Sequence, residues 1–405
     1  MRILIAVEGT RGDVYPMLAM ARHALAHGHE VRLVAPPDFG DDVRACGAEF
    51  VSMGVSVREF IIGHAAALHS RGPQMFAEMK KWGDESIVSQ FAVLPDAARD
   101  CDYVLAAGTI LAASSAAELA GIPYRFIAYT PALLPSCEHT PAMLPFQLRS
   151  RLANRALWWL SEKAMNAAVR RDLNRKRAEL GLAPIRDAIR HVLSERPLIA
   201  VDHALARMPD DGSIRFEQIR CLHPHRPDPL PPKLEAFLEQ GPKPVYLGFG
   251  SMPDPDPART TERLFDAIRR LGSRALISRG WAGLGEGPVP EDILVIDPVP
   301  HSSLFPRTAL IVHHGGAGTT HTAARSGVPQ IVVPHVLDQF YFARRIADLG
   351  VGPPGIPRAG LSVERLSETL RATLDNEHLE RRASELALAL AELGPTDPDL
   401  DRVLA

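Results

Sequence analysis

The side chains best suited to chemistry follow an apolar run that is typical of a buried strand. There the chain continues as HHGGAGTT, residues 313–320. The glycines have no Cβ, so their amides can approach an anion closely and adopt positive φ. A helix that begins near Thr319 directs its positive end at the same place, and His314, Thr319 and Thr320 can add side-chain donors. The pattern predicts a phosphate site.

The two adjacent histidines cannot both reach that phosphate. Neighbouring side chains of an extended segment point to opposite faces, so only one of His313 and His314 can meet the anion. The same geometry argues against a two-histidine metal site. We assign the phosphate role to His314, and a histidine of the core is the alternative.

A second polar loop follows further along the chain. The apolar strand 330–333 ends at Pro334, and Asp338 and Gln339 come next. Loops at the carboxyl ends of neighbouring parallel strands face one crevice, which is where open α/β sheets bind ligands. A carboxylate and an amide beside a phosphate site suit the hydroxyl groups of a sugar. A solvated loop is the alternative.

The chain opens with a comparable strand, turn and helix. An apolar strand over 3–7 leads to the turn Gly9–Asp13, after which apolar residues recur at helical spacing as far as Gly28, a natural C-cap. The turn lacks the three-glycine spacing of dinucleotide-binding proteins. We expect Asp13 to point into a cleft between two domains. Capping of the following helix is an alternative or additional task for it.

Composition favours a globular protein with two domains. The 405 residues exceed one ordinary core, and 46% hydrophobic with 23% charged residues is typical of globular chains. A net charge of −3 argues against nucleic acid as a partner. The first apolar run is too short for a signal peptide and no run is long enough to cross a bilayer, so we expect no integral membrane association.

Cysteine and aspartate spacing predicts neither disulfides nor a metal site. The four cysteines lie far apart without a CxxC spacing, which favours reduced thiols in a cytoplasmic protein. Asp254 and Asp256 form a DxD string, but prolines surround both residues. We therefore interpret this string as a loop rather than a cation site.

Both halves of the chain alternate strands with helices, which predicts an α/β fold of two doubly wound parallel sheets. We expect a first domain over 1–222, a Pro-rich linker over 223–233, a second domain over 234–385 and a tail over 386–405. Whether the tail crosses back to the first domain is left open. A long basic stretch over 149–180 is expected to form a helix that walls an acceptor site.

The segment 296–339 resembles the nucleotide-sugar signature of the family 1 glycosyltransferases, which are inverting enzymes of the GT-B class. The 44-residue box of the plant members can be laid on it without a gap. Ile296 stands where those enzymes carry a base-stacking Trp and Thr322 where they carry a ribose-binding Glu, so base and ribose must be held differently. The HHGGAGT loop and Arg279–Trp281 are similar to the bacterial branch. That branch includes glycopeptide-antibiotic and other natural-product enzymes, as well as glycolipid and sterol glycosyltransferases.

The resemblance implies the GT-B fold, in which two Rossmann-like domains face each other across a cleft. It also implies a role for each of a set of residues. These are Asp13 as the base that takes the acceptor proton, with Thr10, Arg11 and Gly12 in its loop; Ser251, His314, Gly316, Gly318 and Thr319 for the donor diphosphate; Asp338 and Gln339 for the sugar; and Trp281 and Val299 for the nucleobase. A strand-end turn is the alternative for Ser251, and packing is the alternative for Trp281.

The implied activity is inverting transfer of a hexose or deoxyhexose from a dTDP- or UDP-sugar. The acceptor would be a hydroxyl group of a lipophilic natural product, such as an antibiotic, macrolide, polyketide or phenolic aglycone. The nucleotide sugar is a co-substrate, and neither a cofactor nor a metal is expected. A sterol or glycolipid glycosyltransferase is a second hypothesis, and a nucleotide-sugar epimerase of the same fold is a further one. A non-catalytic homologue that activates a partner predicts loss of the base or the sugar-binding residues, yet Asp13, Asp338 and Gln339 are all present.

Overall fold

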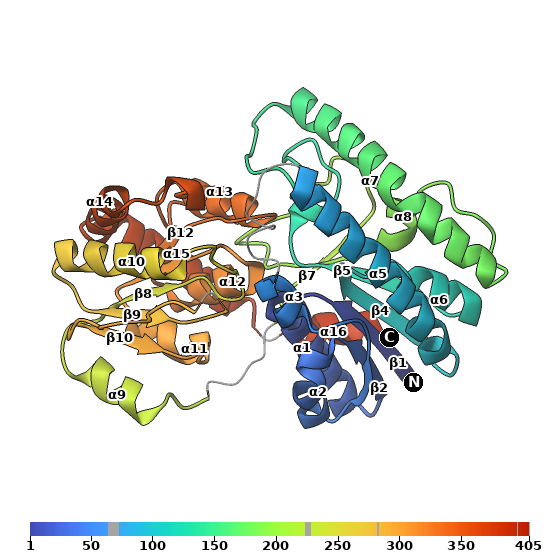
Figure 1. The fold of residues 1–405 in the computed structure, drawn as a ribbon, viewed down its shortest axis with the longest axis horizontal. Helices are drawn as coiled ribbons and strands as arrows, with labels where there is room; N and C mark the ends of the chain where they lie inside the picture. Colours follow the sequence, from blue (N-terminus) through green and yellow to red (C-terminus); the bar gives the residue numbers. More distant parts are fainter. Residues whose placement is uncertain (64–72, 223–227, 282, 395, 405) are drawn as a thin grey trace.

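The computed structural model describes residues 1–63, 73–222, 228–281, 283–394 and 396–404. They form two lobes that lie side by side, each built on a parallel sheet with helices on both faces (Figure 1). The α/β fold with two parallel sheets that the sequence predicts is therefore confirmed. Residues 223–227 of the expected linker lie outside the described part of the chain.

The first lobe contains a seven-stranded sheet in the order β3-β2-β1-β4-β5-β6-β7, and every pairing in it is parallel. Its strands are β1 (Arg2–Glu8), β2 (Glu30–Ala35), β3 (Glu49–Ser52), β4 (Tyr103–Gly108), β5 (Tyr124–Ala128), β6 (Leu198–Ala200) and β7 (Glu217–Ile219). Its helices are α1 (Arg11–Ala26), α2 (Gly40–Cys46), α3 (Val57–Gly63), α5 (Pro73–Ala98), α6 (Ala113–Ala120), α7 (Arg151–Glu179) and α8 (Ala188–Leu193).

The second lobe contains a five-stranded parallel sheet in the order β10-β9-β8-β11-β12. Its strands are β8 (Val245–Gly248), β9 (Ala275–Ser278), β10 (Ile293–Ile296), β11 (Leu310–His313) and β12 (Gln330–Val332). Its helices are α9 (Pro232–Glu239), α10 (Pro257–Leu271), α11 (His301–Leu304), α12 (Ala317–Ser326), α13 (Gln339–Leu349), α14 (Val363–Leu374) and α15 (Glu377–Glu392).

Helix α1 begins earlier than its sequence predicts. Thr10 is its N-cap and Asp13 is the third helical residue, and their side chains and backbones exchange the two bonds of a capping box. The predicted turn Gly9–Asp13 is therefore wrong in length, because Arg11 to Asp13 already belong to the helix. The helix ends at His27, and Gly28 follows with φ +79°.

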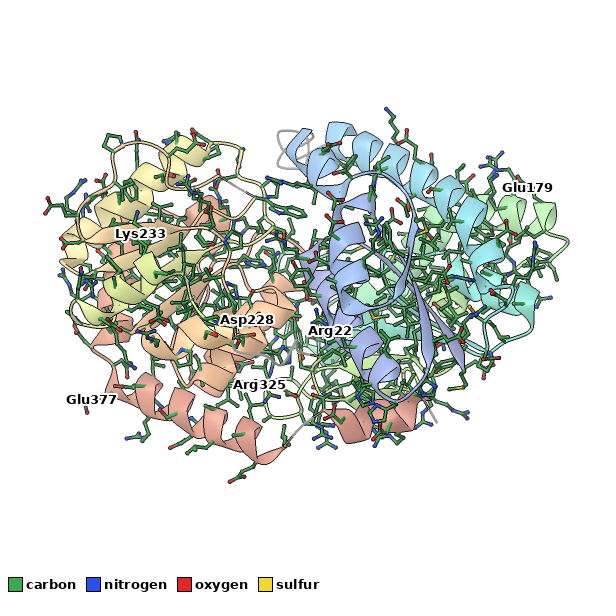
Figure 2. All side chains as sticks on the ribbon, turned by 90° about the horizontal axis from the view of Figure 1, so that it is seen from below. Arg22, Glu179, Asp228, Lys233, Arg325 and Glu377 are labelled. Carbon is green, nitrogen blue, oxygen red and sulfur yellow. The ribbon has the colours of Figure 1, made fainter. Side chains whose placement is uncertain are left out.

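The last helix returns to the first lobe. Helix α16 (Asp397–Leu404) contacts α1. In Figure 2, α15 lies along the second lobe and α16 along the first. Leu400, Val403 and Leu404 enter the apolar core of the first lobe. Asp399 accepts hydrogen bonds from the backbone N–H of Arg220 at 3.0 Å and from its Nε at 2.7 Å. Apolar burial and a paired charge thus hold the end of the chain on the lobe where it began.

The two lobes also meet through a polar link on α12. Asp202, which follows β6 and is fully buried, accepts a hydrogen bond from Arg325 at 2.7 Å. Its backbone N–H lies 3.3 Å from Nε2 of His321. Arg325 lies near the middle of the molecule (Figure 2). The helix expected to carry the phosphate site is therefore fixed to the first lobe.

Within the described parts of the chain, no helix combines the length and the apolar character that crossing a membrane requires.

Candidate functional site

Each sheet has a switch point, where the strand order reverses direction. The reversal lies between β1 and β4 in the first lobe and between β8 and β11 in the second. Open α/β sheets bind ligands at the carboxyl ends of strands at such points. Asp13 follows β1, Ser251 follows β8 and His314 follows β11. The topology therefore brings the predicted residues to these two positions.

The glycine-rich segment forms a tighter turn than expected. Helix α12 begins at Ala317 with Gly316 as its N-cap, two residues before Thr319. The first amides of a helix have no partner within it, so those of 317–319 are available to an anion. Gly318 is exposed, and a Cβ added there would meet nothing within 4 Å. Thr320 does not join the site, because it is buried and its hydroxyl donates to the carbonyl oxygen of Gly316 at 2.9 Å.

The two histidines occupy different environments. His313 is fully buried, with Nε2 2.9 Å from Oε1 of Gln330 and with Nδ1 accepting from the amide of Gly315 at 3.0 Å. Burial lowers the pKa of His313 to about 4, so its ring is neutral. His313 is therefore a hydrogen-bonded histidine of the core.

His314 lies between the loops that follow β8 and β11. A Cβ on Gly316 would come within 2.5 Å of its Nε2, and one on Gly250 within 3.0 Å of its Cε1. These two glycines therefore make room for the ring. Burial first, and then the neighbouring histidines 313, 335 and 301, hold the pKa of His314 well below its usual range. A neutral imidazole donates one N–H to a phosphate oxygen without giving up a proton.

The loop after β8 is joined by backbone contacts to the loop after β9. Gly250 has φ +61°, and its carbonyl oxygen accepts a hydrogen bond from the amide of Trp281 at 2.9 Å. A Cβ on Gly280 would lie 2.3 Å from that oxygen, so the close approach requires glycine. Ser251 and Trp281 are both partly buried at this junction. Val299 packs on the apolar cluster around Phe305. The assigned diphosphate and base roles of Ser251, Trp281 and Val299 stay predictions.

Asp338 and Gln339 differ in how far the protein already uses them. The side-chain oxygen Oε1 of Gln339 accepts from the amides of His335 at 2.7 Å and Val336 at 3.1 Å, so the side chain shapes its own loop. Leu337 has φ +54°, an uncommon conformation for a residue with a Cβ. Asp338 is the N-cap residue of α13 but makes no side-chain capping bond in the described structure. Its carboxyl group is therefore the freer of the two.

Asp13 caps α1 and is placed for a second task. Its Oδ2 accepts from the amide of Thr10 at 2.8 Å, which confirms the capping interpretation. Gly9 has φ +152°, and a Cβ there would lie 2.2 Å from the same oxygen. Burial raises the pKa of Asp13 to about 6, against the lowering effect of the Thr10 bonds. Because the cap engages Oδ2, Oδ1 remains for a proton.

The two carboxyl groups come from opposite lobes and lie near each other. Burial first, and then the charge of Asp13, raise the pKa of Asp338 to about 7. Such an effect acts over short distances, and α12 contacts both α1 and α13, so the carboxyl groups of Asp13 and Asp338 lie near each other across the two lobes. Near neutral pH, Asp13 is the first of the pair to ionise.

A buried carboxyl group beneath this site was missed from the sequence. Glu8 ends β1, is only 4% exposed, and accepts hydrogen bonds from Ser86 at 2.6 Å and Gln90 at 2.5 Å. Burial raises its pKa. Gln90 in turn accepts from the amides of Leu111 and Ala112. The available signal was an acidic residue at the end of an otherwise apolar strand. This network positions the loop after β4 beside Asp13.

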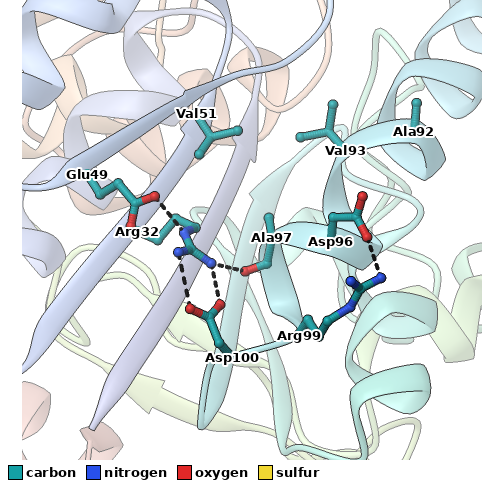
Figure 3. Close-up of a pocket in the computed structure, with 9 residues that line it drawn as sticks. All are labelled: Arg32, Glu49, Val51, Ala92, Val93, Asp96, Ala97, Arg99 and Asp100. Atoms are coloured by element: carbon teal, nitrogen blue, oxygen red, sulfur yellow. Dashed lines mark hydrogen bonds and ion pairs between the residues drawn. The ribbon is translucent and has the colours of Figure 1, made fainter.

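Other polar groups near the lobes have partners of their own. Asp254 pairs with Arg358 at 2.5 Å, and Asp256 accepts from the amide of Arg259 as the N-cap of α10. A cavity of about 520 Å³ lies between α5 and the amino-terminal part of β2 and β3, far from the strand ends that carry the site. Its Arg32 is held between Glu49 and Asp100 (Figure 3). Because these charges are compensated within the protein, we do not interpret this cavity as the substrate site.

Comparison with known proteins decides the family. Residues 3–128 match the model of the glycosyltransferase family 28 N-terminal domain, and residues 264–398 match that of the erythromycin biosynthesis protein CIII-like C-terminal domain. The vancomycin aglycone glucosyltransferase of Amycolatopsis orientalis is 38% identical over 359 residues, which cover 87% of this chain and 85% of that protein. The chain belongs to the GT-B glycosyltransferases. The predicted resemblance to the glycopeptide-antibiotic branch is confirmed.

Two further glycosyltransferases are also similar to this chain. A sterol 3-beta-glucosyltransferase of Arabidopsis thaliana is 33% identical over 412 residues, which cover 96% of this chain and 65% of that protein. The crystal structure of the glycosyltransferase VinC in complex with DTDP superposes with a TM-score of 0.73 at 22% identity, covering 100% of this chain and 98% of VinC. At that identity the superposition shows the shared fold.

Proposed function

We propose that this glycosyltransferase moves a hexose or deoxyhexose, with inversion, from a dTDP- or UDP-sugar to a hydroxyl group of a lipophilic natural product. One observation carries the proposal: Asp13 and Asp338, from opposite lobes, lie near each other, since the charge of Asp13 acts on Asp338 and α12 contacts both α1 and α13. The α12 N-terminus and His314 lie at the switch point of the second lobe. The names of two relatives support it, since one binds DTDP and another acts on the vancomycin aglycone.

Asp13 is the proposed base. Above about pH 6 its carboxylate is ionised and accepts the proton of the acceptor hydroxyl. The hydroxyl oxygen then forms a bond to the anomeric carbon while the bond from that carbon to the diphosphate oxygen breaks. A positioned base of this kind contributes about 10²–10⁴-fold to the rate. The proton ends on Asp13 and the negative charge on the nucleoside diphosphate.

The departing diphosphate needs stabilisation, which we assign to the second lobe. The amides at the start of α12 and the neutral His314 can donate to its oxygens, and the helix end contributes about 0.3–2 kcal/mol. These groups allow the reaction to proceed without a metal ion. Asp338, the later of the two carboxyl groups to ionise, binds hydroxyl groups of the sugar. We also propose a cytoplasmic location, since all four cysteines are free thiols.

The test is direct. Calorimetry with UDP and dTDP measures donor binding, and mass spectrometry of reactions with a library of acceptors and both donor types measures transfer. We expect a nucleotide affinity in the micromolar to millimolar range and a product heavier than the acceptor by one sugar residue. Folded protein that binds neither nucleotide would contradict the proposal. Binding without any transfer would favour the non-catalytic homologue.

A sterol or glycolipid acceptor is the second candidate, and the surface of α7 favours it. Leu152, Trp159 and Leu160 are 78%, 61% and 58% exposed on this helix. The exposed basic side chains Arg151 and Arg155 lie among them. Apolar and basic side chains together suit the surface of an anionic membrane, in which such acceptors dissolve. Sedimentation with anionic vesicles, lost in Trp159→Ser, would support this candidate, and an unbound protein would exclude it.

A further inference from the structure

Three side chains that play no part in glycosyl transfer converge between α1 and α16. His23 and His27 stand one turn apart on α1, and Asp401 lies on α16. Nε2 of His23 is 2.9 Å and Nε2 of His27 is 3.5 Å from Oδ1 of Asp401. All three of these atoms lie within 4.8 Å of one another. His23 is 6% exposed, whereas the side chains of His27 and Asp401 are 48% and 54% exposed, so solvent ions can reach the cluster.

The other ring nitrogens define how the two histidines are protonated. Nδ1 of His27 lies 2.9 Å from the carbonyl oxygen of His23, and Nδ1 of His23 lies 3.2 Å from Oδ1 of Asp397. Those oxygens only accept, so each Nδ1 carries the hydrogen. In the neutral rings, both Nε2 lone pairs then face a carboxylate oxygen. Three electron pairs directed at one point repel one another unless a positive charge, a proton or a metal ion, lies between them.

The same arrangement is typical of metal ligands. A metal-bound histidine almost always donates its second N–H to a carboxylate or a backbone carbonyl, and both kinds of partner occur here. Tetrahedral ligands about 2.1 Å from zinc stand about 3.4 Å apart. The His27–Asp401 separation of 3.5 Å matches this value, whereas the His23–Asp401 separation of 2.9 Å must lengthen by about 0.5 Å when an ion enters. Two neutral imidazoles with the carboxylates of Asp397 and Asp401 carry a charge of −2, which one divalent cation balances.

We propose that His23, His27 and Asp401 bind a divalent transition-metal ion of the zinc class, which fastens α16 to α1. A water molecule completes the tetrahedron, as in sites with three protein ligands. Asp13 lies ten residues before His23 on the same helix, a rise of about 15 Å, so the metal takes no part in sugar transfer. Its effect is structural, because the ion bridges the first lobe and the segment that returns from the second.

The experiment uses the full chain, purified without a histidine tag and stripped with a chelator. Titration with Co²⁺ followed by visible absorption reports tetrahedral ligation, and the Tm is recorded with and without Zn²⁺. We expect one Co²⁺ per chain and a higher Tm with Zn²⁺. The variants His27→Ala and Asp401→Asn change partly exposed side chains, and both should weaken Co²⁺ binding by at least about tenfold.

His378→Ala is the matched control, because His378 is an exposed histidine on α15. It should bind Co²⁺ as the wild type does. Equal binding in His27→Ala and Asp401→Asn would overturn the proposal. So would the absence of both a Co²⁺ band and a Zn²⁺ effect on Tm, since the gap would then hold a proton rather than a metal.

Discussion

At the scale of single residues, Asp13 combines two tasks that conflict in energy. Capping α1 stabilises the fold, whereas holding a carboxylate out of water costs stability and raises its pKa to about 6. The folded state therefore prefers the protonated form, and the cost is fully present above that pH. A residue that only caps a helix would not need to be buried in this way.

Asp13→Asn separates the two tasks. The Asn oxygen can still accept from Thr10, and no buried charge remains, so the Tm at about pH 8 should equal or exceed that of the wild type. Transfer should fall by about 10²–10⁴-fold, while binding of dTDP or UDP is kept. Initial rates, thermal melts and calorimetry measure these effects. Undiminished turnover would remove Asp13 from the mechanism.

The pH dependence of kcat/KM should show the titration of Asp13. Its raised pKa means that the base form is lost as the pH falls through about 6, so the rate at about pH 5 should be about tenfold below the plateau. Asp338→Asn should raise KM but leave this acid limb in place, because Asp338 is already neutral there. A limb near the ordinary pKa of an aspartate, about 4, would contradict a buried base.

Gly318 offers a test of the phosphate site that leaves the fold intact. A Cβ at this position meets nothing within 4 Å, and alanine favours a helix, so Gly318→Ala should melt no lower than the wild type. If the amide approaches a diphosphate, the methyl group should weaken nucleotide binding by about tenfold or more. Calorimetry measures this. Gly316→Ala is the contrasting variant, because its Cβ would collide with His314 and should also lower the Tm.

Local sequence rules predicted different roles for the two histidines, and they did not predict the contacts of every polar residue. Alternation along a strand predicted that only one histidine reaches the site, and the structure buries His313. Thr320 is buried because α12 begins at Ala317. The sequence predicted that this helix begins near Thr319, two residues later. Nε2 of Gln339 lies 3.1 Å from the sulfur of Met252, which belongs to another loop. A local sequence pattern therefore could not predict this contact of Gln339.

At the scale of elements, strands that begin in a clear apolar run were predictable and others were not. The predicted apolar strands over 3–7, before His313 and over 330–333 correspond to β1, β11 and β12. The strands β3 and β7 each begin with a glutamate, and β6 has only three residues, so none of them shows a clear apolar period. Such segments gain their conformation from neighbouring strands, and their own sequences carry little periodicity.

Helix α12 links the donor site to the lobe interface, which Asp202→Ala tests. Removing the carboxylate leaves Arg325 and the amide of Cys221 without their partner. The free energy of unfolding should fall by about 3 kcal/mol, measured by denaturant titration. Asp266→Asn is the control, because its pair with Arg269 is exposed and should contribute less than about 0.5 kcal/mol. Equal losses in the two variants would contradict a buried link.

At the scale of the whole molecule, the sequence predicted two domains because each repeats the same order of elements. It left the acceptor undefined, since we expect loops of the first lobe to recognise it and their side chains follow no periodic pattern. It also left the return of the tail open. Apolar residues recur at helical spacing at Leu400, Val403 and Leu404. This pattern predicts a helix with one buried face but does not indicate which surface the face packs against.

Leu400→Ala tests whether the returning helix holds the molecule together. Leu400 is 4% exposed in the core of the first lobe, so its truncation should cost about 2–5 kcal/mol of unfolding free energy and lower the Tm. Leu388→Ala is the matched control, since Leu388 is 66% exposed on α15 and should change stability by less than about 0.5 kcal/mol. The proposed donor site lies on the other lobe, so nucleotide affinity should persist in both variants at temperatures where they are folded. A Tm equal to that of the control would mean that α16 rests on the first lobe without stabilising it.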